Sequence, residues 1–90
     1  MFRGLHMTDI LLQRITVDPA IFGGKPIIRG RRLAVEHVLS MLAAGDSHET
    51  ILAGYDWLEP EDILACLLFA QRLVAHERYE PPIKTAGDAA

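Results

Sequence analysis

The chain has 90 residues and a formal net charge of −3, and half of its residues are apolar. This length allows one domain with one modest core and is too short for separate cofactor and substrate domains. A single cysteine, Cys66, excludes an internal disulfide and any multi-cysteine metal site within the chain. The longest apolar run, 63–70, is far shorter than the roughly 20 residues that span a bilayer. We therefore expect a cytoplasmic protein with no membrane partner.

Charge is distributed unevenly along the chain. Between Arg14 and Arg32 five basic residues stand against one acid, Asp18, whereas 33–62 holds seven acids and no lysine or arginine. An asymmetry of this kind says more about binding partners than about the fold.

The first third of the sequence predicts an arm. Residues 1–12 fit either a short helix or a loose N-terminal arm. The alternation in 13–17 predicts a strand with Ile15 and Val17 on one face, and Asp18-Pro19 ends it. A glycine bend at 23–24 and a second strand over 25–29 complete a β-arm that occupies 13–32.

Three helices are expected after the arm, of medium, short and long length. Apolar residues at helical spacing predict the first over 33–44, ended by Gly45. Asp46 or Ser47 caps the second, which runs to Ala53. Pro60 opens the third, which runs to about Arg78. The fold class is therefore mainly α, with one domain over 13–78 and a flexible tail over 79–90.

The composition of the third helix predicts that the chain forms a homodimer. It has no charge between Asp62 and Arg72 and is apolar on most sides, which indicates burial on most sides. In so small a protein a homodimer is the simplest way to bury it. The core and dimer positions that we expect are Ile63, Leu64, Leu67, Leu68 and Phe69.

The order of elements is compatible with a trihelical helix-turn-helix domain. The blocks RITVDPAIFGGKPIIRGRRLAVEHVL and AAGDSHETILAGYDWLEPEDILACLLFA resemble the hallmark of domain-of-unknown-function family 433, over roughly residues 14–76. The resemblance implies a homeodomain-like helix-turn-helix preceded by a short β-arm. Family members are often interpreted as VapB-type antitoxins encoded beside a small PIN-like ribonuclease toxin.

Three positions depart from the family pattern. Arg31 replaces a threonine after the IRG motif, Ala34 replaces a proline at the start of the first core helix, and Tyr55-Asp56-Trp57 replaces a Tyr-Pro turn. These changes affect the surface chemistry of the arm and of the turn, and leave the fold that the resemblance implies intact.

The basic residues of the arm are the main candidates for function: Lys25, Arg29, Arg31 and Arg32. Such a cluster binds phosphates or an acidic protein surface, but pairing with acids of the same chain, such as Glu36, is the alternative. Acids fill the first turn of the third helix at 59, 61 and 62, where a recognition helix would enter DNA. If the protein binds double-stranded DNA, we expect the arm to make the contact.

The remaining motifs give weaker support for a functional site. The GGKP segment lacks the Ser/Thr and helix of a phosphate-binding loop, and the four histidines show no metal-ligand spacing. Cys66 is expected to be a buried, inert thiol, and Trp57 with Tyr55 is expected to cover the turn before the third helix. We expect no cofactor, no metal and no catalytic residue.

The sequence and the resemblance together predict an antitoxin-like protein that binds and neutralises a PIN-like toxin and regulates its own operon through DNA binding. The alternative is a stand-alone helix-turn-helix regulator of transcription that uses the same basic arm.

Overall fold

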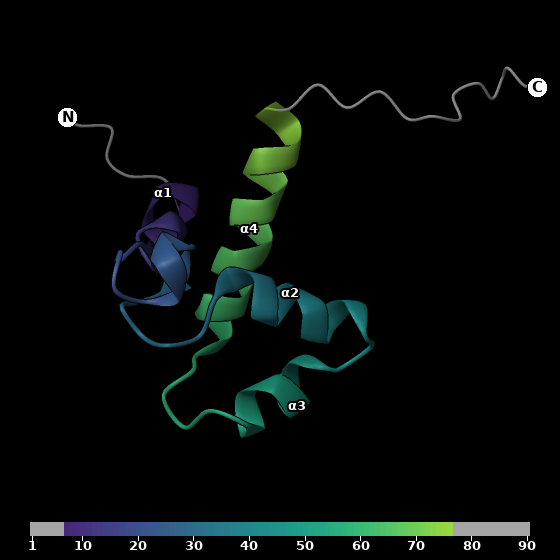
Figure 1. Ribbon diagram of the computed structural model, residues 1–90. Coiled ribbons are helices and arrows are strands. Elements are labelled where there is room, and N and C mark those ends of the chain that lie inside the picture. The colour runs from purple at the N-terminus through teal and green to yellow at the C-terminus, as the bar shows by residue number, and fades with distance from the viewer. Residues whose placement is uncertain (1–6, 77–90) are drawn as a thin grey trace, which may run out of the picture.

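The computed structural model describes residues 7–76, which form a mainly helical domain with a short antiparallel hairpin (Figure 1). Its elements in chain order are α1 (Met7–Leu12), β1 (Ile15–Thr16), the 3₁₀ turn η1 (Phe22–Gly24), β2 (Ile27–Ile28), α2 (Val35–Ala43), α3 (His48–Ala53) and α4 (Pro60–His76). The expected tail over 79–90 and the last turn of the predicted third helix lie outside the described residues. None of the described helices is long and apolar enough to cross a membrane.

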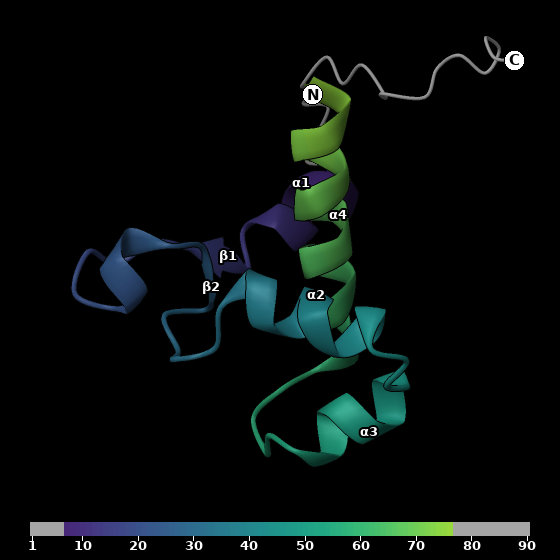
Figure 2. The same cartoon turned by 45° about the vertical axis from the view of Figure 1, so that its right-hand side comes forward.

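Helix α1 shows that 7–12, the described half of the first twelve residues, take the helical one of the two alternatives. Residues 7–12 are helical, and α1 lies against α4 in both views of the molecule (Figures 1 and 2). Its Leu11 and Leu12 are half-buried, whereas Met7 and Ile10 are exposed. The segment that precedes the hairpin therefore packs on the same long helix as the rest of the domain.

The two strands of the hairpin are shorter than predicted. Ile15 pairs with Ile28 and Thr16 with Ile27, and the ladder goes no further. Asp18 ends it, because its Oδ1 accepts the Ala20 N–H at 2.9 Å and turns the chain away from β2. Val17 is exposed as a result, and it does not share a buried face with Ile15.

Helices α2 and α3 begin and end where local signals predict, within two residues. Helix α2 starts at Val35, and the Ala34 N–H before it donates to Nδ1 of His37 at 3.2 Å. Gly45, with φ of 98°, follows the helix and turns the chain toward α3. The Ser47 hydroxyl caps α3 by accepting the Thr50 N–H at 3.1 Å.

The core lies where α2, α3 and the first half of α4 meet β2. Its buried members are Ile28, Leu33, Val35, Val38, Ile51, Leu58, Ile63 and Cys66. The second half of α4 extends beyond α2 and α3 (Figure 2). In the single chain Leu64 and Leu67 of this helix are 46% and 41% exposed, so the described elements of the chain do not themselves provide the burial on most sides that the sequence predicts through a second copy.

Candidate functional site

A carboxylate, Asp62, is wholly buried at the first turn of α4. Its two oxygens accept four hydrogen bonds, from Arg14 Nη1 at 2.9 Å, Arg29 Nε at 3.0 Å, Arg29 Nη2 at 2.8 Å and the Glu59 N–H at 2.8 Å. A charge taken out of water is tolerated only when it is paired and hydrogen-bonded in this way. Asp62 therefore fastens the β-hairpin to the start of α4.

Glu59 belongs to the same cluster. Its Oε1 lies 2.7 Å from Arg14 Nη1, so two acids share the two arginines of the hairpin. Arg14 and Arg29, which the fold brings to this turn from the hairpin, compensate the charges of Glu59 and Asp62. Of the three acids at this turn, Glu61 is exposed and forms no ion pair with another described residue.

Arg29 reaches Asp62 because of an uncommon backbone conformation. Its φ is 47° and that of Gly30 is 70°, and the Arg31 N–H donates to the Ile28 carbonyl at 2.8 Å. Positive φ at both central residues is typical of a type I′ turn, in which Asn or Gly normally takes the first position. The bidentate contact with Asp62 and a 2.8 Å bond to the Trp57 carbonyl offset the strain of placing Arg29 there.

The contacts among Asp62, Arg14 and Arg29 shift the pKa of each of these three groups toward the charged form. Burial alone would raise the pKa of Asp62, but hydrogen bonds from Arg29, the Glu59 amide and Arg14 outweigh it and hold that pKa below its ordinary value. The hydrogen bond to Glu59, followed by the one to Asp62, raises the pKa of Arg14, and the bond to Asp62 raises that of Arg29. Asp62, Arg14 and Arg29 are therefore all charged near neutral pH and hold the hairpin to α4 as an ion-paired group.

Arg31 and Arg32 project from the same turn into solvent. The Arg31 guanidinium lies 4.8 Å from the centre of the Trp57 ring, and Arg29 lies 5.6 Å from that ring. Tyr55 packs edge-on against Trp57 at 6.0 Å. Neither Arg31 nor Arg32 forms an ion pair with any residue of 7–76. Trp57 thus holds Arg31 in place without neutralising its charge.

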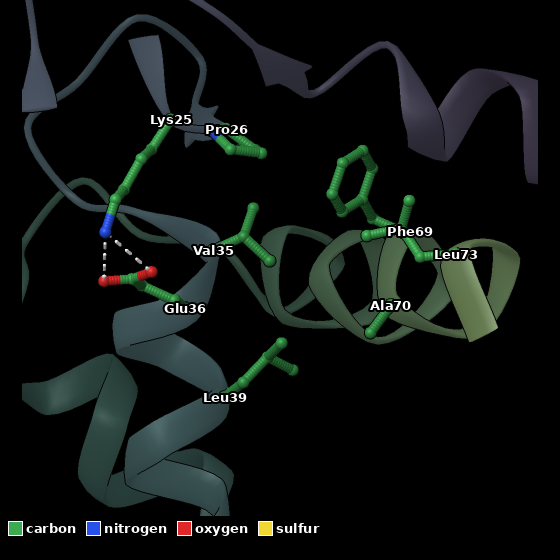
Figure 3. A pocket seen from close by; sticks show the side chains of 8 residues that line it. All are labelled: Lys25, Pro26, Val35, Glu36, Leu39, Phe69, Ala70 and Leu73. Atoms are coloured by element: carbon green, nitrogen blue, oxygen red, sulfur yellow. Dashed lines mark hydrogen bonds and ion pairs between the residues drawn. The ribbon is translucent and has the colours of Figure 1, made fainter. Parts of the chain in front are cut away.

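Lys25 is engaged elsewhere. Its Nζ lies 3.1 Å from Oε2 of Glu36, across the mouth of an apolar groove of about 220 Å³ between α2 and α4 (Figure 3). Leu39 and Val35 of α2 face Phe69 and Leu73 of α4 across this groove. The four predicted basic residues therefore separate into two that pair with carboxylates of the described chain, Lys25 and Arg29, and two that do not, Arg31 and Arg32.

Little in the described residues points to catalysis. No group of three or more His, Cys, Asp or Glu side chains in 7–76 is placed to hold a metal ion. Cys66 is buried, as predicted, and burial together with the nearby charge of Asp62 raises its pKa to about 12, so its thiol stays protonated.

Sequence reasoning missed the partners of this surface. The sequence predicts Asp62 only as an acid of the first turn of the third helix and Arg14 only as part of the basic stretch. The available signal was that Arg29 and Asp62 both lie inside the quoted motif blocks, in IRG and EDI.

Comparison with known proteins identifies the family. A profile described as "Protein of unknown function (DUF433)" matches residues 15–70. The chain is also similar to "Uncharacterized protein y4eO" of Sinorhizobium fredii (strain NBRC 101917 / NGR234), with 37% identity over 57 residues, which are 63% of this chain and 26% of that protein. The chain thus covers about a quarter of that relative. No solved structure gives a significant match. Because the profile covers more than half of the sequence, the chain belongs to the DUF433 family.

Proposed function

We propose that this protein is the antitoxin-like half of a type II toxin–antitoxin pair, and that it binds a PIN-like ribonuclease through the turn that carries Arg31 and Arg32. The observation that carries the proposal is the division of the basic residues. Arg14, Lys25 and Arg29 have carboxylate partners within the described chain, whereas Arg31 and Arg32 have none. Charges without internal partners are the ones available to another molecule.

An acidic protein surface fits this turn. Members of the DUF433 family are often interpreted as antitoxins of a PIN-like ribonuclease, and a nuclease of that kind has a metal site ringed by carboxylates. Arg pairs with carboxylates in a bidentate way, and a guanidinium already held over Trp57 loses little freedom on binding. In this proposal Arg31 and Arg32 enter the carboxylate site of the nuclease and compete there with metal or RNA.

The second part of the proposal is that the protein binds DNA and represses its own operon. The alternative to the antitoxin proposal as a whole is a stand-alone regulator of transcription. Helices α2 and α3, joined by the turn at Gly45, followed by α4, have the order of a helix-turn-helix domain. However, Glu59 and Glu61 stand exposed at the first turn of α4, where they would repel DNA phosphates. Contact with a protein is therefore the part of the proposal that we place first.

The test begins with a tagged copy of the full chain expressed at native level, recovered after nuclease treatment and analysed by mass spectrometry. A PIN-like protein recovered in near-equal amount is then co-expressed with each variant in a growth-rescue assay. We expect the double variant Arg31→Ala/Arg32→Ala to lose neutralisation and Lys25→Gln, which removes one charge from the same arm, to retain it. Full rescue by the double variant would overturn the role of the turn.

A fluorescence anisotropy titration with DNA from upstream of the gene separates the two functions. If the affinity for DNA falls steeply with salt concentration and no nuclease is recovered, the protein is a stand-alone regulator and the antitoxin proposal is rejected. The single tryptophan, Trp57, provides a second readout, because its emission should change when the carboxylates of a partner bind the Arg31 guanidinium beside the ring.

A further inference from the structure

Helix α4 presents an apolar stripe to solvent. Leu64, Leu67 and Val74 follow one another at spacings of three and seven residues, which places them on one side of a helix. They are 46%, 41% and 68% exposed, and Gln71 is the polar residue among them. No described element of the chain covers this stripe.

The stripe is separate from the proposed partner site. Asp62 and Leu64 are two residues apart and therefore point about 200° apart around the helix axis. Asp62 faces the hairpin and Arg29, so Leu64 faces away from them. Phe69 and Leu73, which line the groove toward α2, likewise lie on the side of Asp62 (Figure 3). Both surfaces can be occupied at the same time.

Charges beside the stripe match those of a second copy. Glu61 and Arg72 are eleven residues apart, close to three full turns, so both lie along the same flank of the stripe. Both are exposed, and neither forms an ion pair with any residue of 7–76. In an antiparallel pair of such helices, related by a two-fold axis, each acid lies opposite the base of the other chain.

We propose that two copies of this chain associate through α4, with the helices antiparallel and the two-fold axis near Leu67. The midpoint between Glu61 and Arg72 falls between residues 66 and 67, which fixes the register in which both ion pairs form. Leu67 of one chain then lies against Leu67 of the other at the axis. Leu64 of each chain packs against the helix of the other chain beside this contact. The antiparallel arrangement also sets opposite ends of the two helix dipoles side by side.

The first measurement is the mass of the purified full chain by sedimentation equilibrium over a range of concentrations. We expect a species of twice the 10.0 kDa chain mass. Leu67→Glu should weaken the dimer by at least about a hundredfold, because it places two carboxylates at the axis. Leu73→Glu is the matched control, since the same substitution on the same helix faces the groove and should leave the dimer intact. Circular dichroism confirms that both variants fold.

A charge swap tests the orientation. Glu61→Arg and Arg72→Glu should each weaken the dimer by about tenfold, because each creates two like-charged pairs, and the double variant should restore the affinity of the wild type. In addition, Leu67→Cys should oxidise to a covalent dimer under mild conditions, and Leu73→Cys should not.

A wild-type chain that remains at 10.0 kDa at every concentration would overturn the proposal and leave the stripe to a different protein. A dimer that survives Leu67→Glu would overturn it as well, because the contact would then use another face. Failure of the charge swap to restore affinity would reject the antiparallel register.

Discussion

Asp62 is the residue on which the geometry of the hairpin depends. It receives two arginines from segments that lie 48 and 33 residues earlier in the chain, and it is 0% exposed. Arg29 stays in a left-handed conformation with this carboxylate as its partner. The charge thus determines a backbone conformation as well as a side-chain contact.

Replacement of Asp62 by asparagine should lower the free energy of unfolding by about 2–3 kcal/mol. The amide keeps the shape of the side chain but leaves Arg29 without a carboxylate and Arg14 with Glu59 alone. Because these arginines remain 26% and 30% exposed, water recovers part of the loss. Urea denaturation followed by circular dichroism measures the change. Glu61→Gln, one residue away and exposed, is the control and should change stability by less than about 0.5 kcal/mol.

The pH dependence of stability follows from the lowered pKa of Asp62. Near pH 4 the unfolded chain binds a proton at this residue that the folded chain does not, so stability falls as pH falls through that region. The difference in stability between wild type and Asp62→Asn should be constant from about pH 5 to pH 8 and shrink below about pH 4. Denaturation curves at a series of pH values test this. If the difference in stability between wild type and Asp62→Asn were the same at pH 3 as at pH 7, the loss of stability in acid would not come from Asp62.

The cluster around Asp62 could not be predicted from local pattern. Periodicity and capping relate residues a few positions apart, whereas Arg14 and Asp62 meet only after the hairpin has folded onto α4. Pairing of the arm with acids of the same chain was one of the two alternatives considered. For Lys25 the suggested partner, Glu36, is the one found, while for Arg29 the partner is an acid at the helix start.

At the scale of elements, local chemistry was sufficient for the helices. Ser47 caps α3, Pro60 opens α4 and Gly45 follows α2, each as its residue type predicts. The strands were predicted too long, because alternation alone does not register the turn that Asp18 imposes after Thr16. A two-residue ladder depends on tertiary packing, which no local pattern encodes.

Gly45 and Gly54 allow a matched test of the turns that end α2 and α3. Gly45 has φ of 98°, which a side chain rarely adopts, although a Cβ there would meet no atom within 4 Å. Gly54 has φ of −84° in the right-handed region, and its Cβ would make an ordinary contact. Gly45→Ala should therefore cost about 1–2 kcal/mol through backbone strain alone, and Gly54→Ala should be neutral or slightly stabilising. Thermal denaturation of the two variants measures this difference, and equal effects would contradict it.

On the scale of the whole molecule, the chain separates its surfaces by chemistry. The turn with Arg31 and Arg32 is cationic, and the stripe on α4 is apolar and lies on the side of that helix turned away from the Asp62 cluster. The sequence predicted that both regions interact with something, from the basic arm and the uncharged helix. The sequence could not show which arginines pair with carboxylates of the same chain, because ion pairing depends on the folded positions of acids that are distant in sequence.

Association through α4 would make the stability of the protein depend on its concentration. A dimer that must dissociate before its chains unfold gains stability by mass action, so the wild-type Tm should rise by roughly 3–5 °C for each tenfold increase in concentration. The Tm of Leu67→Glu should be independent of concentration, because that variant has no partner to lose. Scanning calorimetry over two decades of concentration makes the comparison. Coincident wild-type curves would mean that the exposed leucines of α4 are tolerated by a stable monomer, and the stripe would then contribute nothing to the stability of the fold.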